Sequence, residues 1–302
     1  MRHTVEAAGT LLEVLERMHP GASKRTLRTM LDVGRVTVDG TVERRAKAEV
    51  PAGATIEVGA KVSKPTKATP GPKVLYEDEF VLVAEKPHGL LTVATDQGAE
   101  DTLYDRAFEH AKRARRGGRV FIVHRLDRPT SGVVVLAKDE ETKEALQAEF
   151  AERDVERVYA ALVEGVPAEK EGKLVAHLKE SKSLQVYATP DKKGGRRVAL
   201  DYRVMAEGGG YSLVEVTLET GRKAQIRVQF AEAGHPLAGD ARYGAKTDPL
   251  GRLGLHAMRL AFDHPATGER IVVESPPPKR FWSVVGGRSA PTAQEELTPD
   301  EE

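Results

Sequence analysis

A segment rich in lysine and proline divides this chain into two unequal parts. Residues 59–73, GAKVSKPTKATPGPK, contain four Lys and three Pro and no Asp or Glu. The segment has few apolar side chains to bury, and its prolines favour the extended backbone of a semi-rigid linker. We therefore expect a small domain at residues 1–58 and a larger one at residues 74–285. Residues 286–302 are acidic and without apolar periodicity, which predicts a disordered tail.

The composition excludes several classes of chemistry. Cysteine is absent from the 302 residues, which excludes disulfides, thiolate nucleophiles and Cys-ligated metal sites. The nine His form no H-E-x-x-H pattern, and no glycine-rich phosphate loop is present, so we expect no metal and no nucleotide cofactor. No apolar run approaches the roughly 20 residues that span a bilayer. The N-terminus lacks the apolar stretch of a secretory signal, which favours a cytoplasmic protein without a membrane partner.

The charges are distributed unevenly, although the formal net charge is zero. Residues 1–70 contain 12 Lys and Arg against 8 Asp and Glu, a net charge of +4. The last 15 residues contain one Arg against five carboxylates, a net charge of −4. The chain without its tail is therefore mildly basic, and local patches matter more for binding a polyanion than the total charge does.

Residues 10–57 have the pattern of a small α/β module. Apolar spacing predicts a helix from Leu11 to Met18, and Ser23 is placed to cap a second helix that stops at Gly34. An alternating strand at residues 35–38 then reaches the hairpin turn Asp39-Gly40, and another strand is expected at residues 55–58. The second helix and its end carry four cations, which form either a solvated face or a surface for a polyanion: Lys24, Arg25, Arg28 and Arg35.

The larger domain has many strand-like runs and few helical ones. This pattern predicts an α+β fold with a mixed, largely antiparallel sheet and flanking helices. Strands are expected near residues 74–76, 81–84, 120–123, 132–137, 157–163, 199–205, 211–218, 256–262 and 270–273. Helices are expected near residues 102–116, 141–151 and 222–233.

A polar loop between two apolar strands contains the strongest candidate for chemistry. Residues 123–138 read VHRLDRPTSGVVVLAK, and Asp127 is flanked there by Arg125 and Arg128. Nearby positive charge favours the anionic form of a carboxylate. Held at a fixed position beside an apolar sheet, such a carboxylate serves as a nucleophile or as a general base. A structural ion pair that fixes the loop explains the same residues equally well.

Two further segments each contain one residue of interest. Arg227 lies between the apolar residues Ile226 and Val228 in LETGRKAQIRVQ, an unusual place for a cation without a buried partner. Tyr159 lies in the strand-like run RVYAALVEG, where a tyrosine is more often part of the core than of a site. Taken singly, neither residue indicates a function.

Together these motifs resemble those of the RluA-type RNA pseudouridine synthases. Six segments match the family in order along residues 74–285: LYEDEFVLVAEKPHGLLT, HRLDRPTSG, RVYAALVEG, LETGRKAQIRVQ, GDARYG and LHAMRLAFDHP. Residues 1–58 resemble the S4 RNA-binding domain, which precedes the catalytic domain in some family members. The resemblance implies an enzyme that isomerises uridine to pseudouridine in structured RNA without a cofactor or a metal. Large-subunit ribosomal RNA is favoured as the partner, transfer RNA is the alternative, and no obligate protein partner is expected.

The resemblance also implies roles for individual residues. Asp127 is the expected catalytic carboxylate, Tyr159 is expected to stack on the target uracil, and Arg227 is expected to pair with Asp127. Arg125, which is expected to help displace the target base, forms with Arg128 and Gln225 the set of expected substrate contacts. The four cations of the N-terminal module are expected to contact RNA. Ala224 departs from the family pattern, which often has His there, so a hydrogen bond near the site or an RNA contact is left open.

Two alternative functions remain open. A non-catalytic RNA-binding or assembly protein on the same scaffold has Ala224 as its only support. A hydrolase with an Asp nucleophile shares Asp127, but it matches no motif and does not explain the N-terminal module. A second basic cluster forms either the wall of an RNA-binding cleft or a solvated helix end: Lys112, Arg113, Arg115, Arg116 and Arg119.

Overall fold

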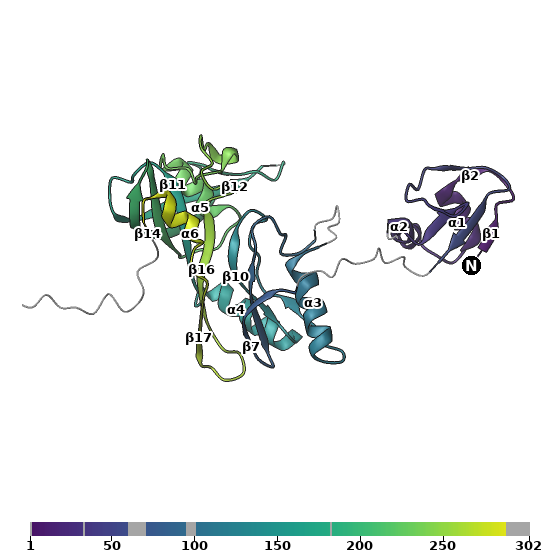
Figure 1. Ribbon diagram of the computed structural model, residues 1–302, viewed down its shortest axis with the longest axis horizontal. Coiled ribbons are helices and arrows are strands. Elements are labelled where there is room, and N and C mark those ends of the chain that lie inside the picture. Colours follow the sequence, from purple (N-terminus) through teal and green to yellow (C-terminus); the bar gives the residue numbers. More distant parts are fainter. Residues whose placement is uncertain (1, 33, 60–70, 95–100, 182, 288–302) are drawn as a thin grey trace, which may run out of the picture. The chain divides into compact units, whose positions relative to one another are not determined.

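The computed structural model describes residues 2–32, 34–59, 71–94, 101–181 and 183–287 (Figure 1). The chain separates into two compact units, Met1–Thr69 and Pro70–Glu302. Most of the expected linker, at residues 60–70, and nearly all of the expected tail, at residues 288–302, lie outside the described residues.

The N-terminal unit contains two short helices whose starts are capped by side chains. α1 (Leu11–Met18) begins with a capping box, in which the Thr10 hydroxyl accepts from the Glu13 amide and the Glu13 carboxylate accepts from the Thr10 amide. α2 (Lys24–Asp32) begins after Ser23, whose hydroxyl accepts from the Thr26 amide at 3.1 Å. The cap at Ser23 is the one that the sequence predicted.

These helices pack on short antiparallel strands and form a core of their own. One sheet has the order β1 (Arg2–Thr4), β6 (Thr55–Val58), β3 (Val36–Val38), β4 (Thr41–Val42), and β2 (Gly9–Thr10) pairs with β5 (Glu49–Val50). Asp39 and Gly40 have φ values of 49° and 82°, which fit the two-residue hairpin turn that the sequence predicted. Leu11, Leu27 and Ile56 are fully buried between the helices and the strands.

An eleven-stranded mixed sheet forms the frame of the second unit (Figure 1). Its main path runs β13-β12-β14-β15-β11-β16-β10-β8-β7, with β17 beside β16 and β9 beside β10. Neighbouring strands are antiparallel except β10 and β16, which are parallel, so the expected α+β fold with a largely antiparallel sheet is confirmed. The strands are β7 (Lys73–Glu77), β8 (Val81–Lys86), β9 (Phe121–Ile122), β10 (Ser131–Ala137), β11 (Glu156–Glu164), β12 (Glu171–Glu180), β13 (Val186–Ala188), β14 (Arg196–Gly208), β15 (Tyr211–Leu218), β16 (Leu255–Asp263) and β17 (Arg270–Glu274).

Helices cover both faces of each half of this sheet. α3 (Leu103–Ala114) packs on one face of β8 and β10, and α4 (Glu140–Glu152) packs on the other. α5 (Gln225–Glu232) and α6 (Lys279–Val284) enclose β11 and β15 in the same way. Every residue of β10, SGVVVLA, is buried, so its continuous apolar run belongs to a strand that is covered on two faces.

The parallel pair of β10 and β16 fixes the place where the HRLDRPTSG run enters the sheet. Ser131 is paired with His256, and Gly132 is paired with Ala257. Gly132 has a φ of 118°, and a Cβ at this position would lie 2.1 Å from the Ala257 carbonyl oxygen. Glycine is therefore required at this junction, and the polar loop before it starts from a rigid support.

Two strands and one α-helix of this unit were not predicted from the sequence: β12, β13 and α6. Most residues of β12, EGKLVAHLKE, are exposed or half-buried, so the strand shows no clear apolar alternation. β13 and α6 have only three and six residues, too few for a periodic signal. Among the residues that the structure describes, no helix is both long and apolar enough to cross a membrane.

Substitution of Phe262 tests the packing of the core between β10, β17 and α4. Its side chain is fully buried, so Phe262→Ala should lower the free energy of unfolding of this unit by about 3–5 kcal/mol. Val272, on the neighbouring strand β17, is 56% exposed, and Val272→Ala should cost less than about 0.5 kcal/mol. Urea unfolding followed by the fluorescence of Trp282, the single Trp of the chain, measures both. Equal effects of the two substitutions would contradict this packing.

Candidate active site

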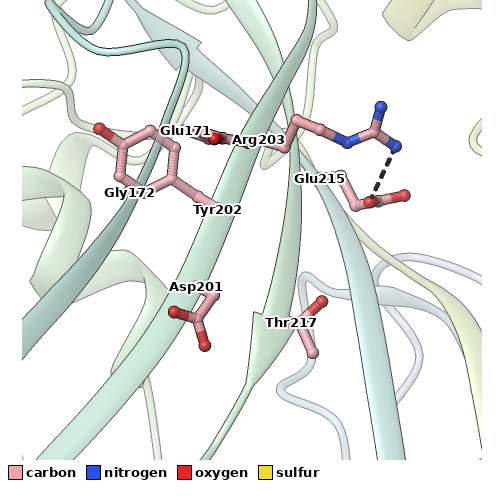
Figure 2. Close-up of a pocket in the computed structure, with 7 residues that line it drawn as sticks. All are labelled: Glu171, Gly172, Asp201, Tyr202, Arg203, Glu215 and Thr217. Atoms are coloured by element: carbon pink, nitrogen blue, oxygen red, sulfur yellow. Dashed lines mark hydrogen bonds and ion pairs between the residues drawn. The ribbon is translucent and has the colours of Figure 1, made fainter.

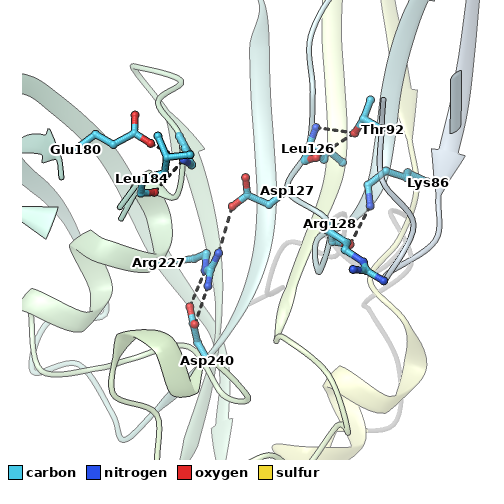
Figure 3. A network of polar contacts seen from close by, with 10 residues as sticks. Lys86, Thr92, Leu126, Asp127, Arg128, Glu180, Leu184, Arg227 and Asp240 are labelled. Carbon is cyan, nitrogen blue, oxygen red and sulfur yellow. Dashed lines mark hydrogen bonds and ion pairs between the residues drawn. The ribbon is translucent and has the colours of Figure 1, made fainter. Parts of the chain in front are cut away.

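The polar loop of residues 124–130 joins β9 to β10 and is held by the segment that follows β8 (Figure 3). The Thr92 hydroxyl donates to the Leu126 carbonyl at 2.9 Å and accepts from the Leu126 amide at 3.2 Å. The Gly89 amide donates to the Arg128 carbonyl at 2.8 Å. Asp127 therefore lies between two residues whose backbones are fixed.

Lys86, at the end of β8, is fully buried and strengthens this attachment (Figure 3). Its ammonium donates to three backbone carbonyls: Leu90 at 2.7 Å, Pro87 at 3.1 Å and Arg128 at 3.3 Å. Burial lowers the pKa of Lys86 to about 8, so the amine is still mostly protonated at pH 7. A single buried cation thus binds residues 87–90 to the loop that carries Asp127.

Arg227, in the first turn of α5, lies between two carboxylates (Figure 3). Its Nε and Nη2 donate to the two oxygens of Asp240 at 2.7 and 2.8 Å, and its Nη1 donates to Oδ2 of Asp127 at 3.3 Å. The Tyr243 ring covers the guanidinium, with 4.9 Å between Cζ and the ring centroid. Burial opposes the charge of Arg227, but the bonds to Asp240 and the charge of Asp127 outweigh burial and raise its pKa. The expected pair of Arg227 with Asp127 is thus present.

The two carboxylates differ in exposure. The Asp240 side chain is 2% exposed and is bound by both arms of the guanidinium, whereas the Asp127 side chain is 32% exposed and has one longer bond. The bidentate pair therefore fixes Arg227, and Asp127 keeps an oxygen available to a ligand.

Asp127 opens into a cleft of about 750 Å³ between residues 91–94, the loop 124–130, β11 and residues 218–227. Tyr159 of β11 is half-buried and lines this cleft. Burial raises the pKa of Tyr159 to about 12, so its phenol is neutral at physiological pH. Among the described residues that line the cleft, Asp127 is the single carboxylate, and the cations are Arg125, Arg128, Arg157, Arg222, Lys223 and Arg227.

The three expected substrate contacts are placed differently at this cleft. Arg125 and Arg128 are exposed and line it. Gln225 is buried: its amide oxygen accepts from the Thr220 hydroxyl at 2.8 Å, and its amide nitrogen donates to the Ala199 carbonyl at 3.0 Å. The polar atoms of Gln225 are engaged within the protein, so we expect it to shape the wall of the cleft rather than to contact the substrate.

Ala224 is the residue before α5 and has a left-handed backbone, with φ 53° and ψ 18°. Among residues with a Cβ, this conformation is enriched in Asn, Asp and His and is unfavourable for Ala. Ala224 lines the cleft and supplies no side-chain cap to the helix. The turn is therefore formed without the polar side chain that His would place here.

The expected RNA-binding cations belong to the other compact unit. Lys24, Arg25 and Arg28 are exposed on α2. Arg35 follows α2, and its Nε donates to the Gly59 carbonyl at 3.0 Å. The second basic cluster, residues 112–119, lies at and after the end of α3 and does not line the cleft around Asp127.

Sequence reasoning missed Lys86 and Asp240. A signal for Lys86 was present, because alternation in VLVAEK puts it on the same strand face as the apolar Leu82 and Ala84. Asp240 lies in GDARYG, and its spacing from Arg227 does not reveal that the two side chains meet. Only the packing of α5 against the 3₁₀ turn Ala241–Tyr243 brings Asp240 to Arg227.

A second depression, of about 460 Å³, lies on β12, β14 and β15 (Figure 2). Its charged groups pair with one another or with neighbours: Arg203 donates to Glu215 at 3.2 Å, and Lys173 lies 3.7 Å from Asp201. It contains no carboxylate held by a buried cation, so we place the candidate active site at Asp127.

The lowered pKa of Lys86 can be tested by measuring how the free energy of unfolding depends on pH. Because its pKa of about 8 in the folded chain lies below the ordinary 10.5, the unfolded chain binds more protons between these values. The contribution of Lys86 to stability therefore rises from pH 8 to 10.5. Relative to Lys86→Met, the wild-type free energy of unfolding should increase between neutral and alkaline pH in urea titrations. The exposed control Lys192→Met should follow the wild type, and a constant difference from Lys86→Met would contradict the lowered pKa.

Comparison with known proteins finds relatives along most of the chain. Residues 80–232, about half of it, match the family described as RNA pseudouridylate synthase. A Neisseria meningitidis serogroup A protein named ribosomal large subunit pseudouridine synthase D is 33% identical over 295 residues, which cover 92% of this chain and 78% of that protein. A Pseudomonas aeruginosa protein of the same name is 33% identical, over 89% of this chain and 88% of its own length.

The fold has counterparts among solved structures. The human protein RNA pseudouridylate synthase domain containing 1 aligns with a TM-score of 0.60 and 23% identity, over 80% of this chain and all of that one. At this identity the likeness concerns the fold alone. The family match and the two curated relatives show that the chain belongs to the RluA-type RNA pseudouridine synthases, a family of isomerases.

Proposed function

We propose that this enzyme isomerises specific uridines in structured ribosomal RNA, with large-subunit RNA favoured, and that Asp127 is its catalytic carboxylate. The observation that carries the proposal is the position of Asp127: it is the single carboxylate among the described residues of the cleft, and it is partly exposed and held by Arg227. The choice of RNA is supported by the two relatives, which are named ribosomal large subunit pseudouridine synthases.

The reaction requires one carboxylate at a fixed place. The N1–C1′ bond breaks, the uracil turns, and C5 joins C1′; the proton leaves C5 and N1 gains one, so the change is neither a redox reaction nor a hydrolysis. Asp127 can attack a carbon or remove a sugar proton. In either role it acts as an anion, and the guanidinium of Arg227, 3.3 Å away, stabilises that anion.

Arg227 and Asp240 prepare the site before the substrate arrives. Asp240 binds two nitrogens of Arg227 within a buried environment, so the direction of the third nitrogen is set by the protein. A preorganised cation of this kind needs no reorientation when charge develops in the transition state. Asp240 is thus a positioning residue that acts through Arg227.

The target uridine has to leave its stack before C5 can reach C1′. Flipping a base costs a few kcal/mol, and stacking on an aromatic ring returns roughly 1–3 kcal/mol. Tyr159 supplies such a ring in the cleft, and its high pKa keeps the phenol uncharged. Arg125 and Arg128, exposed on either side of Asp127, are placed to displace the base and to attract the strand.

The N-terminal unit, with its order of two helices and a hairpin, is proposed to act as an S4-like RNA-binding domain. Lys24, Arg25 and Arg28 share α2 and are all exposed, as contacts to phosphates require. Recognition of structured RNA by phosphates and shape suits a basic helix without base-specific groups. This unit would add affinity and register to the catalytic unit.

Replacing Asp127 tests the catalytic assignment. Asp127→Asn should fold and bind RNA almost normally, yet release tritium from uracil C5 at least about 10²-fold more slowly, since loss of a positioned acid–base group costs about 10²–10⁴. The substrate is an unmodified transcript of large-subunit ribosomal RNA. Asp201→Asn, which removes an exposed carboxylate from the depression of Figure 2, should react like the wild type.

Three outcomes of this assay would correct the proposal. Release retained by Asp127→Asn rules out its catalytic role. Free uracil in the products would indicate a hydrolase. Wild-type release from transfer RNA but not from ribosomal transcripts would change the substrate and leave the role of Asp127 intact.

The salt dependence of RNA binding tests the N-terminal unit. Replacing Lys24, Arg25 and Arg28 together by Met should weaken binding and reduce the slope of log K against log salt by about 2, because each lost phosphate contact removes roughly 0.7–0.9. The matched triple variant replaces Arg113, Arg115 and Arg116 by Met, and an unchanged slope there identifies the α3 cluster as a solvated helix end. An unchanged slope in the α2 variant would exclude these cations from the RNA interface.

A further inference from the structure

Arg157 is a buried cation in the cleft that the proposed reaction leaves without a task. It lies on β11 two residues before Tyr159 and lines the same cleft. Only 8% of the residue is exposed, and its Nε is buried without a hydrogen-bond partner. No carboxylate of the described residues is among the groups that shift the pKa of this guanidinium.

This situation differs from that of the other arginines held inside the unit. Arg227 is bound by two carboxylates. Arg252 donates to the Ser131 hydroxyl at 2.7 Å and to the Leu255 carbonyl at 3.0 Å. Burial disfavours a charge that has no partner, and it lowers the pKa of Arg157. The described part of the chain thus contains a buried cation for which it supplies no carboxylate partner.

The guanidinium of Arg157 lies between an aromatic ring and a glycine. Its Cζ lies 5.7 Å from the centroid of the Phe150 ring, and Phe150 stacks on His124 with 4.6 Å between centroids. Burial and the charge of Arg157 lower the pKa of His124 to about 3, so this imidazole is neutral and supplies no counter-charge. A Cβ at Gly221 would lie 2.1 Å from Nη1 of Arg157, so the glycine leaves the room that the guanidinium occupies.

We infer that Arg157 binds a phosphate of the RNA strand, next to the nucleotide that stacks on Tyr159. The inference rests on the proposed function, because it takes RNA as the ligand. A phosphate brings the missing negative charge, which the neutral carbonyl of a uracil does not. A guanidinium also matches two phosphate oxygens with two parallel donors. The nearness of Arg157 and Tyr159 on one strand places this phosphate beside the flipped base.

The test compares uridine with its 3′- and 5′-monophosphates as ligands of the full chain. All proteins carry Asp127→Asn, so no turnover occurs and the result does not depend on catalysis. Dissociation constants are measured by NMR titration. The parent should bind one monophosphate more tightly than uridine by about tenfold, as hydrogen bonds to a charged group allow. Adding Arg157→Met should reduce this preference to less than about twofold while uridine binding changes little.

Two further variants distinguish the loss of a contact between Arg157 and phosphate from a general loss of charge and from misfolding. Arg153→Met removes an exposed cation at the end of α4 that does not line the cleft, and it should keep the full preference. Gly221→Ala keeps the charge of Arg157 but occupies the space of Nη1, so it should also reduce the preference. The φ of Gly221 is not in the left-handed region, so the added methyl group acts on Arg157 rather than on the turn.

Several results would overturn the inference. A preference that survives Arg157→Met puts the phosphate on another cation of the cleft. Loss of uridine binding with an unchanged preference assigns Arg157 to the base. Equal binding of uridine and both monophosphates by the parent, or no binding of the monophosphates at millimolar concentration, excludes a phosphate site here. None of these results bears on the role of Asp127, which tritium release tests independently.

Discussion

The ion pairs of Arg227, whose side chain is only 12% exposed, are the interactions on which the rest of the site depends. Asp240 binds two of its nitrogens, and the remaining arm reaches Asp127 across the cleft. A largely buried cation is stabilised by a buried carboxylate, here Asp240. Because Asp240 binds two nitrogens of the guanidinium, it also fixes the orientation of Arg227. The geometry of the Asp127 carboxylate is therefore set from α5 and from Asp240, which does not line the cleft.

The loop that carries Asp127 is fixed independently from the other half of the sheet. Lys86 binds the Arg128 carbonyl, and Gly132 lies so close to Ala257 that no side chain fits between them. Each half of the sheet has helices on both faces, and the cleft lies where the halves meet at β10, β16 and β11. The two halves of the sheet thus hold the two members of one ion pair, and groups fixed in this way form a preorganised site.

The charges of the cleft suit a polyanionic substrate. Six cations and a single carboxylate are found among its described residues, and that carboxylate is already paired. The Phe150 ring beside Arg157 and the His124 ring that stacks on it are uncharged at neutral pH. In the proposed complex, a phosphate backbone would supply the negative charge that the described lining of the cleft lacks, and the neutral ring of Tyr159 would receive a base.

The sequence by itself determined the order of the motifs, the cap at Ser23, the turn at Asp39-Gly40 and most strands, because each is recorded in residues close together in the chain. It also brought Asp127, Tyr159 and Arg227 together through the family pattern. The tertiary structure alone decided that Asp240 holds Arg227, that Gln225 turns inward and that Nε of Arg157 is buried without a hydrogen-bond partner. Such facts depend on which side chains meet across long stretches of chain, and local periodicity reports only which face of an element is buried. The absence of a counter-charge is the hardest of these facts to predict from sequence, because it can be recognised only when all neighbours of the side chain are known.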